Sequence, residues 1–402
     1  MRSSRQAGVR GWSLAIVVVL GTAGCGGGGG GDSSAASDPT PLAQNVLPII
    51  VDAGPANTIN TPFVSVTICT PGGSNCQTID GVIVDTASTG LRIMSSVLSP
   101  SLALTQQTSS SGSPLVECMQ FADGYTWGPV KAADVRLGGQ SVNSLAIQII
   151  GDPAFSNVPL SCSNTGPAEN TVQAFGGNGI LGVGAFQQDC GALCAQAAIP
   201  GTYYACAGAA CQAVAIDLAR QVQNPVGMLA SDNNGVVIDL PAVAATGAAT
   251  VTGSLILGIG TRTNNALGNA VVFALDPNAG TLTTVFNGQS YTSSFIDSGS
   301  NAIFFPDGAT TVCSSGFYCP ASLQQLTATN LGTNGSSGTV NFSVANADNL
   351  LAVGNRAFNN LAAPPSGIPS FDWGLPFHFG RRVFTAIEGR SSPGGSGPYV
   401  AY

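Results

Sequence analysis

Short apolar runs alternate along the chain with clusters of glycine, asparagine, serine and proline. The runs are rich in β-branched and aromatic residues and read FVSVTIC, GVIVD, LAIQIIG, GVVIDL, SLILGIG, AVVFAL and SFIDSGSNAIFF. Short strands with glycine-rich turns predict an all-β fold of the sandwich or barrel type. Helical periodicity is scarce. The best helix candidate is 211–223, with apolar residues at 214, 218 and 222 and Pro225 soon after.

A different pattern marks the N-terminus. Three arginines precede the apolar run WSLAIVVVLGTAG, which is long enough for a signal peptide but short for a membrane span. The run ends at Cys25. Six glycines and the segment DSSAASDPTPLAQN follow, a composition typical of flexible linkers. We therefore predict a signal peptide over 1–24 and a linker over 25–44.

The segment LGTAGC resembles the lipobox of bacterial lipoproteins, in which the cysteine becomes the lipidated first residue of the mature chain. Thr22 stands where that pattern usually has leucine. The resemblance implies a lipid anchor on Cys25, while ordinary signal-peptide cleavage and a retained anchor remain as alternatives. In each case we expect an exported protein. It would be either a cell-envelope lipoprotein, in the outer membrane or facing the periplasm, or a secreted protein.

Composition narrows the functional classes. The chain has 402 residues, enough for two units with separate cores, although one compact domain is also possible. Hydrophobic residues make up 44% and charged residues only 8%. The 20 acidic residues outnumber the 12 basic ones, and no basic cluster occurs. We therefore expect no nucleic acid partner, because binding to phosphate backbones depends on clustered lysine and arginine.

Cysteine usage points to disulfides. Besides Cys25 the chain has ten cysteines, an even number in a chain predicted to be exported. Four pairs are close in sequence and leave one pair over a longer loop: Cys69/Cys76, Cys190/Cys194, Cys206/Cys211 and Cys313/Cys319, then Cys118/Cys162. The sequence leaves this connectivity open, since the four cysteines between 190 and 211 can exchange partners. A zinc site is disfavoured because the spacings lack paired C-x-x-C and His378 is the only histidine.

One local pattern occurs twice. The segment GVIVDTASTGLRI places Asp85 after an apolar strand, and SSFIDSGSNAIFFP places Asp297 in the same way in the other half of the chain. Two copies of one structure can meet across a pseudo-two-fold axis. Two carboxylates facing each other share one proton, because both cannot ionise together. Such a dyad can activate a water molecule with its ionised member and polarise a carbonyl with its protonated member.

These residues resemble the pepsin-like aspartic peptidases, whose two lobes each supply such a loop. The resemblance runs in order across roughly 45–390. It includes NTPFVSVTIC before the first aspartate, FADGYTWGPVKAADVRLGG (121–139) as a hairpin flap, GGNGILGVG behind the first aspartate, NNGVVIDLP and GSLILGIG near the end of the first lobe, and FDWGLPFHFGRRVFTAIEG in the second lobe. It implies an all-β, bilobal fold with pseudo-two-fold symmetry and a cleft between an N-terminal lobe (45–265) and a C-terminal lobe (266–402).

The resemblance also assigns roles to single residues. Asp85 and Asp297 match the catalytic pair. Five neighbours match residues that support the dyad: Thr86, Ser88, Ser298, Gly299 and Ser300. Three residues belong to the flap, where they would contact substrate: Phe121, Tyr125 and Trp127. Two positions depart from the family pattern, because Ala87 replaces a glycine and Phe121 replaces a tyrosine.

Other ionisable residues offer no comparable pattern. With one histidine and no nucleophile signature, serine and cysteine triads are excluded. His378 lies in the apolar run LPFHFG and is expected to be structural. Four carboxylates without a partner pattern are expected in surface or turn roles: Glu117, Asp123, Asp134 and Asp239.

We therefore predict a monomeric aspartic endopeptidase that binds an extended peptide or protein substrate and uses neither metal nor cofactor. It would be lipid-anchored or secreted. Two other classes remain open. One is a pepsin-fold binding lipoprotein that has lost turnover through Ala87 and Phe121. The other is a surface adhesin or structural lipoprotein built on the same scaffold.

Overall fold

A computed structural model describes residues 43–367 and 369–402. Ala43–Tyr402 forms one compact unit. The predicted signal peptide, Cys25 and nearly all of the predicted linker lie outside the described residues. Within the described ranges, no helix is long and apolar enough to cross a membrane.

Strands dominate the described part of the chain and form two large sheets. The larger sheet contains β1 (Val46–Val51), β2 (Pro62–Cys69), β3 (Cys76–Asp85), β4 (Thr89–Met94), β5 (Thr105–Gln106), β6 (Leu115–Gln120), β7 (Tyr125–Leu137), β8 (Gln140–Ile150), β9 (Gly179–Val183), β10 (Tyr203–Ala207), β11 (Ala210–Ala213), β12 (Gly235–Leu240), β13 (Val251–Leu257), β14 (Val272–Ala274), β22 (Arg381–Ala386) and β25 (Tyr399–Ala401). The second contains β15 (Leu282–Phe286), β16 (Gln289–Ile296), β17 (Ile303–Phe304), β18 (Gln324–Leu331), β19 (Ser337–Val344), β20 (Ala362–Ala363) and β21 (Asp372–Trp373). A small hairpin pairs β23 (Ser391–Ser392) with β24 (Gly395–Ser396).

Helices in the described ranges are short and lie in connections. The α-helices are α1 (Leu160–Ser163), α2 (Val172–Phe175), α3 (Ala192–Gln196), α4 (Ala347–Ala352) and α5 (Leu375–His378). Single 3-10 turns are η1 (Ser95–Val97), η2 (Pro153–Phe155), η3 (Leu218–Arg220), η4 (Val226–Met228) and η5 (Thr263–Asn265). The predicted all-β class is confirmed.

The predicted helix over 211–223 is wrong. Its first residues form β11, which pairs with β10 in an antiparallel hairpin, and the Cys206–Cys211 disulfide joins the two strands. Only the single turn η3 is helical in this stretch. Leu218, one of the apolar positions behind the prediction, is 42% exposed, so the spacing does not mark a buried helix face.

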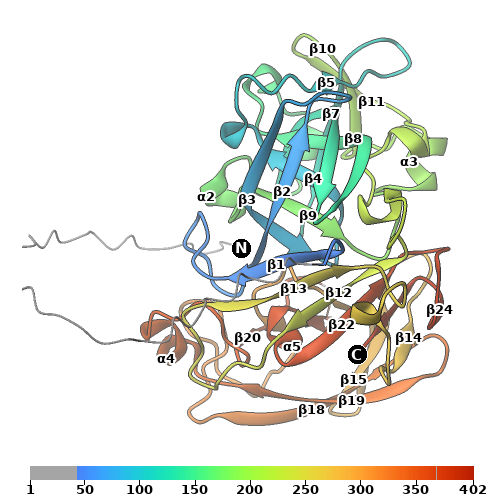
Figure 1. Cartoon of the computed structure of the whole chain (residues 1–402). Coiled ribbons are helices and arrows are strands. Elements are labelled where there is room, and N and C mark those ends of the chain that lie inside the picture. Colours follow the sequence, from blue (N-terminus) through green and yellow to red (C-terminus); the bar gives the residue numbers. More distant parts are fainter. Residues whose placement is uncertain (1–42, 368) are drawn as a thin grey trace, which may run out of the picture. The chain divides into compact units, whose positions relative to one another are not determined.

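Both aspartate loops sit in the same strand arrangement. In the first half β3 runs parallel to β9, β9 antiparallel to β4, and β4 parallel to β8. In the second half β16 runs parallel to β21, β21 antiparallel to β17, and β17 parallel to β20. Each loop therefore joins two strands that lie on either side of a third. This repeat is the pseudo-two-fold, pepsin-like architecture that the sequence implied, and strands β1, β13, β12 and β22 pair in succession as one part of the large sheet (Figure 1).

The cores of the two halves differ in composition. The first is aliphatic and includes strands with continuous apolar sequence, such as β9 (GILGV), every residue of which is buried. Strands covered on both faces have this composition. The second core is aromatic and packs the rings of Phe286, Phe305, Phe342, Phe371 and Trp373 against one another. These cores fix the strands that end at the two aspartates.

All five disulfides expected from the spacing are present. They join Cys69 to Cys76, Cys118 to Cys162, Cys190 to Cys194, Cys206 to Cys211 and Cys313 to Cys319. The structure thereby resolves the ambiguity among the four cysteines between 190 and 211. Four of the five bonds close short loops, and the Cys118–Cys162 bond links β6 to α1 across 44 residues.

Candidate active site

The two aspartates lie at equivalent positions in their loops. Asp85 is the last residue of β3, and Asp297 follows directly after β16. In each loop the backbone N–H two residues on donates to the carboxylate. The Ala87 N–H lies 2.7 Å from Asp85 Oδ1, and the Gly299 N–H lies 2.7 Å from Asp297 Oδ1. Ala87 therefore supplies the same backbone hydrogen bond as the glycine of the second loop.

Crossed hydrogen bonds join the loops through Thr86 and Ser298. The Thr86 N–H donates to Ser298 Oγ at 3.2 Å, and the Ser298 N–H donates to Thr86 Oγ1 at 3.0 Å. Each hydroxyl then donates to a carbonyl of the opposite strand, Thr86 to Ile296 at 3.1 Å and Ser298 to Val84 at 2.8 Å. All four bonds are buried. They hold the two aspartates in fixed relation to each other.

Gly299 lies against both carboxyl groups. A Cβ at this position would be 2.9 Å from Asp85 Cγ and 3.2 Å from Asp297 Oδ1. Both distances are shorter than ordinary van der Waals contact. A glycine is needed here for space and not for backbone conformation, because Gly299 is not among the residues with positive φ. Ala87 occupies the matching position of the first loop and is exposed, so a methyl group is accommodated there.

The two carboxyl groups lie together beside Gly299, because its Cβ position is 2.9 Å from Asp85 Cγ and 3.2 Å from Asp297 Oδ1. The pKa of Asp297 is raised well above its ordinary value, first by burial, then by the negative charges of Asp85 and Asp372. A hydrogen bond from Ser300 acts in the opposite direction. A pair in this situation keeps one proton to a higher pH than a solvent-exposed aspartate would, and the two groups titrate as a unit.

The hydroxyl groups next to the dyad are arranged asymmetrically. Ser300 Oγ lies 2.8 Å from Asp297 Oδ2 and 2.5 Å from Asp372 Oδ2, so it contacts two carboxyl groups. Ser88 Oγ, its counterpart in the first loop, is buried against Gly182 and has no hydrogen-bond partner among the described residues. Asp372 was not singled out by the sequence pattern, although it lies in the segment FDWG that resembles the strand behind the second aspartate.

Comparison with known proteins places the chain in a family. The model of the family described as "Protein of unknown function (DUF3443)" matches residues 41–402. The chain belongs to the DUF3443 family. No curated protein matches this DUF3443 protein.

Among solved structures, an aspartic proteinase from Irpex lacteus is similar to the DUF3443 protein. The two are 14% identical, with a TM-score of 0.49, and the alignment covers 89% of this chain and 96% of that chain. The repeated strand order and the crossed hydrogen bonds between the loops define the fold independently of this likeness.

The bounds of the predicted flap are wrong: 121–139 holds a turn, 121–124, and only one strand, β7, and the hairpin forms because β7 pairs with the preceding strand β6 across this turn. Phe121 packs against Phe175, with ring centroids 5.7 Å apart in an edge-to-face arrangement. Both rings contact a cluster that contains Ile83, which precedes Asp85 by two residues. Residues two apart on a strand face the same side of the sheet. Phe121 therefore belongs to an apolar surface on the face of β3 that carries Asp85.

Tyr125 and Trp127 lie on β7, after the turn. Both are buried in a cluster with the Cys118–Cys162 disulfide, and Trp127 packs on Tyr204 with centroids 5.3 Å apart. The indole N–H donates to the Phe155 carbonyl at 2.7 Å. The structure thus brings Phe121, and not these two residues, to the end of the hairpin.

Both edges of the DUF3443 hairpin are hydrogen-bonded to other segments. Strand β10 pairs with β6. On the other side the Tyr125 N–H donates to the Pro167 carbonyl at 3.0 Å, and the Glu169 N–H donates to the Tyr125 carbonyl at 2.8 Å. A Cβ on Gly124 would lie 2.5 Å from the Pro167 carbonyl oxygen, so the turn itself packs against this segment.

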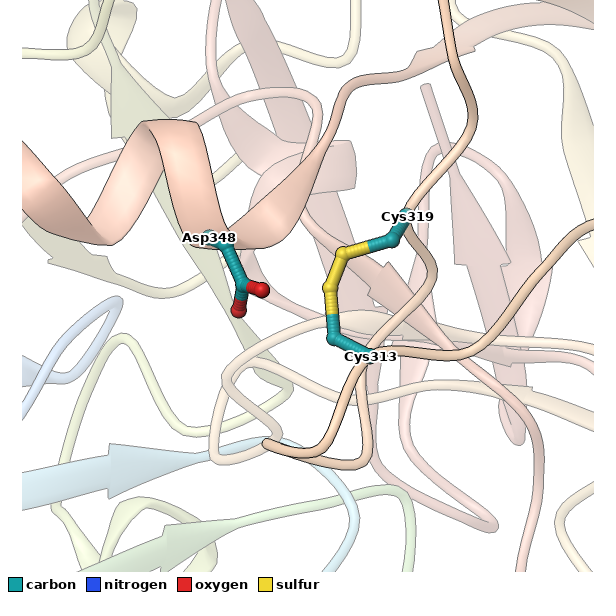
Figure 2. Close-up of side chains that lie close together, drawn as sticks. All are labelled: Cys313, Cys319 and Asp348. Atoms are coloured by element: carbon teal, nitrogen blue, oxygen red, sulfur yellow. A yellow bond between two sulfur atoms is a disulfide. The ribbon is translucent and has the colours of Figure 1, made fainter.

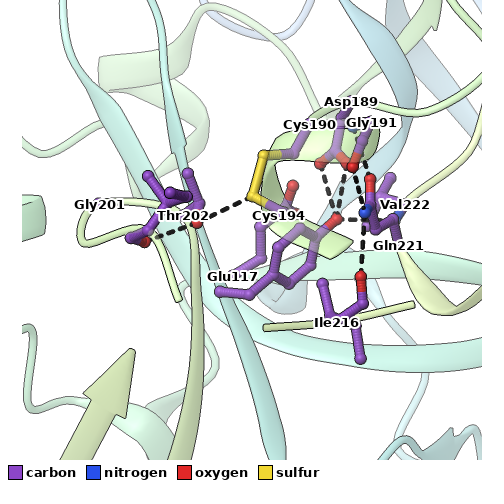
Figure 3. Close-up of a disulfide and its surroundings, with 12 residues drawn as sticks. Glu117, Asp189, Cys190, Gly191, Cys194, Gly201, Thr202, Ile216, Gln221 and Val222 are labelled. Carbon is purple, nitrogen blue, oxygen red and sulfur yellow. Dashed lines mark hydrogen bonds between the residues drawn. A yellow bond between two sulfur atoms is a disulfide. The ribbon is translucent and has the colours of Figure 1, made fainter. Parts of the chain in front are cut away.

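A buried ionic cluster connects the first loop to the hairpin. Arg92 of β4 is fully buried, and its guanidinium lies 2.6 Å from Glu117 of β6 and 3.0 Å from Asp189. It also donates to the Thr89 carbonyl at 2.7 Å. Burial, followed by the neighbouring Glu117, raises the pKa of Asp189 well above its usual value. Figure 3 shows Glu117 and Asp189 beside the Cys190–Cys194 disulfide. The expected surface role of Glu117 is therefore wrong.

One further cluster in the described ranges has the composition of a metal site. Cys313, Cys319 and Asp348 place their ligand atoms within 4.8 Å of one another. Figure 2 shows that the two sulfur atoms are bonded to each other, with Asp348 of α4 beside them. A disulfide lacks the thiolate that binds metals. This cluster is therefore a disulfide next to a helix and not a metal centre.

Proposed function

We propose that this DUF3443 protein is an aspartic endopeptidase whose Asp85 and Asp297 carboxyl groups share one proton and activate a water molecule. One observation carries the proposal. Two carboxyl groups meet in loops that have matching backbone donors and crossed hydroxyl hydrogen bonds. The end of a strand is enough to explain a single aspartate in a turn. It does not explain two that are held against each other with one carboxyl pKa raised.

The proposed reaction needs no covalent intermediate. The ionised carboxylate takes a proton from water as the water oxygen attacks the peptide carbonyl carbon. The protonated carboxyl group meanwhile donates a hydrogen bond to the carbonyl oxygen. When the tetrahedral intermediate collapses, the C–N bond breaks and the leaving nitrogen receives a proton from the dyad. Activity requires a singly protonated pair, so we expect a bell-shaped pH profile.

An extended peptide substrate would lie between the dyad and the hairpin β6–β7. The apolar surface formed by Phe121, Phe175 and Ile83 supports a preference for apolar side chains near the scissile bond. Specificity of this kind is modest, because one methylene in an apolar pocket changes transition-state binding by only about 1–3 kcal/mol. A monomer with both loops in one chain is sufficient for the reaction.

Export and lipid anchoring are part of the proposal. Five disulfides support an oxidising compartment such as the periplasm or the cell surface. The anchor would be carried by Cys25, as a cell-envelope lipoprotein, while a secreted form would lack it. Fatty-acid labelling of the native chain and of a Cys25→Ala variant in a bacterial host tests this. Label in both chains, or in neither, would count against the anchor.

The test of catalysis uses the unit Ala43–Tyr402, which has its own cores. It is incubated with a mixed peptide library at about pH 3–7, with and without a pepstatin-type inhibitor. Asp85→Asn and Asp297→Asn are compared with Asp239→Asn, a matched change of an aspartate whose side chain is 43% exposed. We expect cleavage by the native unit and by Asp239→Asn only.

Two outcomes would overturn the proposal. Cleavage that survives both dyad substitutions excludes this mechanism. A folded native unit that cleaves nothing at any pH favours the alternative, a catalytically impaired peptide- or protein-binding lipoprotein. In that case Ala87→Gly and Phe121→Tyr are made to learn which departure from the family pattern removed turnover.

A further inference from the structure

Asp372 breaks the symmetry between the two halves. In the first half Ile83 pairs with Ile180, and in the second half Phe295 pairs with Asp372. Ile83 and Phe295 each precede a dyad aspartate by two residues, so Asp372 occupies the position that Ile180 has in the first half. One half has an apolar side chain here, and the other has a carboxyl group that contacts Ser300.

The hydrogen atoms at Ser300 can be counted. Its Oγ lies 2.8 Å from Asp297 Oδ2 and 2.5 Å from Asp372 Oδ2. A serine hydroxyl has one hydrogen to donate and two lone pairs to accept with. Both contacts are therefore hydrogen bonds only if one of the two carboxyl groups is protonated and donates to Ser300.

The surroundings indicate which group holds that proton. Asp297 accepts from the Gly299 N–H as well, and donors of this kind stabilise an ionised carboxylate. Asp372 lies between Phe295 of β16 and Phe304 of β17, and its Oδ1 is buried without a partner among the described residues. The charged groups that act with it are the carboxylates of Asp85 and Asp297. Burial, first, and the Asp85 charge raise the pKa of Asp372 to about 8.

The geometry points to a positioning role for Asp372: in its protonated form it donates to Ser300 Oγ and thereby directs the Ser300 hydrogen onto Asp297. When Asp372 ionises, it competes for the Ser300 hydrogen and Asp297 loses a donor. This inference rests on the proposed function for its effect on catalysis, while the protonation state of Asp372 can be measured without turnover.

The first measurement is a carboxyl titration by NMR of the unit Ala43–Tyr402 with ¹³C-labelled aspartate. Comparison of the native unit with Asp372→Asn assigns the Asp372 resonance as the one that disappears. We expect this resonance to remain in its protonated position at about pH 6, where an ordinary aspartate is ionised. A resonance that titrates near the ordinary value overturns the inference, whether or not the protein cleaves peptides.

The second measurement is the pH profile of kcat and KM for two variants. Asp372→Asn keeps an N–H donor for Ser300 but cannot ionise, and Asp372→Ile copies the first half and has no donor. We expect Asp372→Asn to retain native kcat at acidic pH and Asp372→Ile to lose roughly tenfold in kcat, with KM little changed. Asp239→Asn serves as the unchanged control.

The alkaline limb of the pH profile shows whether Asp372 acts through its ionisation or only through its packing. Loss of two protons inactivates the native enzyme, so log(kcat/KM) should fall with a slope approaching about −2, and with about −1 in Asp372→Asn. Equal slopes in the two proteins, or equal kcat in Asp372→Asn and Asp372→Ile, would overturn the role. If the native unit has no activity, the proposed function fails and the NMR titration alone decides the protonation of Asp372.

Discussion

Replacement of Arg92 by methionine tests the buried ionic cluster behind the first loop. Methionine keeps much of the length of the arginine stem and removes the charge. Glu117 is 1% and Asp189 4% exposed, so both carboxylates would be left without their cation in a site that water does not reach. Removing one partner of a buried ion pair costs about 3–5 kcal/mol, a large part of the stability of a typical domain, which is about 5–15 kcal/mol.

The loss should depend on pH. Burial already raises the pKa of Asp189 above its unfolded value, and without Arg92 this carboxyl group loses the cation that lowers its pKa, so the folded-state pKa rises further. The folded state then binds more protons than the unfolded state, so stability is highest at low pH and falls as pH rises through the folded pKa. We therefore expect the full loss near about pH 8 and a much smaller one near about pH 4, where Asp189 with its raised pKa is protonated.

Urea unfolding of the unit Ala43–Tyr402 at the two pH values measures both effects. Arg136→Met, a change of an exposed arginine on β7, should alter the free energy of unfolding by less than about 0.5 kcal/mol. Adding Glu117→Gln and Asp189→Asn to Arg92→Met should restore part of the stability, because the unpaired charges are then gone. A loss below about 1 kcal/mol, or the same loss at both pH values, would refute this account of the cluster.

Three further predictions follow from contacts described above. Gly299→Ala places a Cβ 2.9 Å from Asp85 Cγ, so kcat should fall about 100-fold or more while the melting temperature changes little; normal turnover would contradict the packing. The pKa of Asp372 rises from 3.8 to about 8, so the folded state gains a proton and stability should fall as pH rises through that range. The upper limit of this fall is about 6 kcal/mol, and urea unfolding of Asp372→Asn should show a smaller fall. Replacing Cys118 and Cys162 by alanine should lower the free energy of unfolding by about 2–5 kcal/mol in the same assay. An unchanged free energy of unfolding would show that this disulfide does not stabilise the fold.

Much of the fold could be predicted from the sequence, because both halves repeat an apolar strand that ends in aspartate and hydroxyl residues. The disulfides followed from short spacing. The positions that were missed depend on pairing between distant segments. Glu117 shows no partner in sequence because Arg92 lies 25 residues away on another strand. The helix predicted over 211–223 is wrong because the prediction rested on only three apolar positions. The first residues of the segment pair with β10 in a disulfide-linked hairpin instead.

Asp372 is the most instructive omission at the candidate site. Alone, an aspartate between two aromatic residues has no evident role in the sequence. Aligning FDWG with GILG, the strands behind the two aspartates, places Asp372 opposite Ile180 and marks the substitution. That signal was available from the internal repeat, but the contact with Ser300 depends on the parallel register of β16 and β21, which only the structure supplies.

The bracing of the hairpin β6–β7 has a consequence for ligand capture. Its strands are fixed by β10, by the segment that follows Gly166 and by the Cys118–Cys162 bond. A segment ordered during folding loses little conformational entropy when a ligand arrives, so the free energy of contact is not spent on ordering it. We therefore expect peptide length and shape to limit entry more than hairpin motion does. The association rate should then vary strongly between peptides and the hairpin amides should exchange slowly, bound or free.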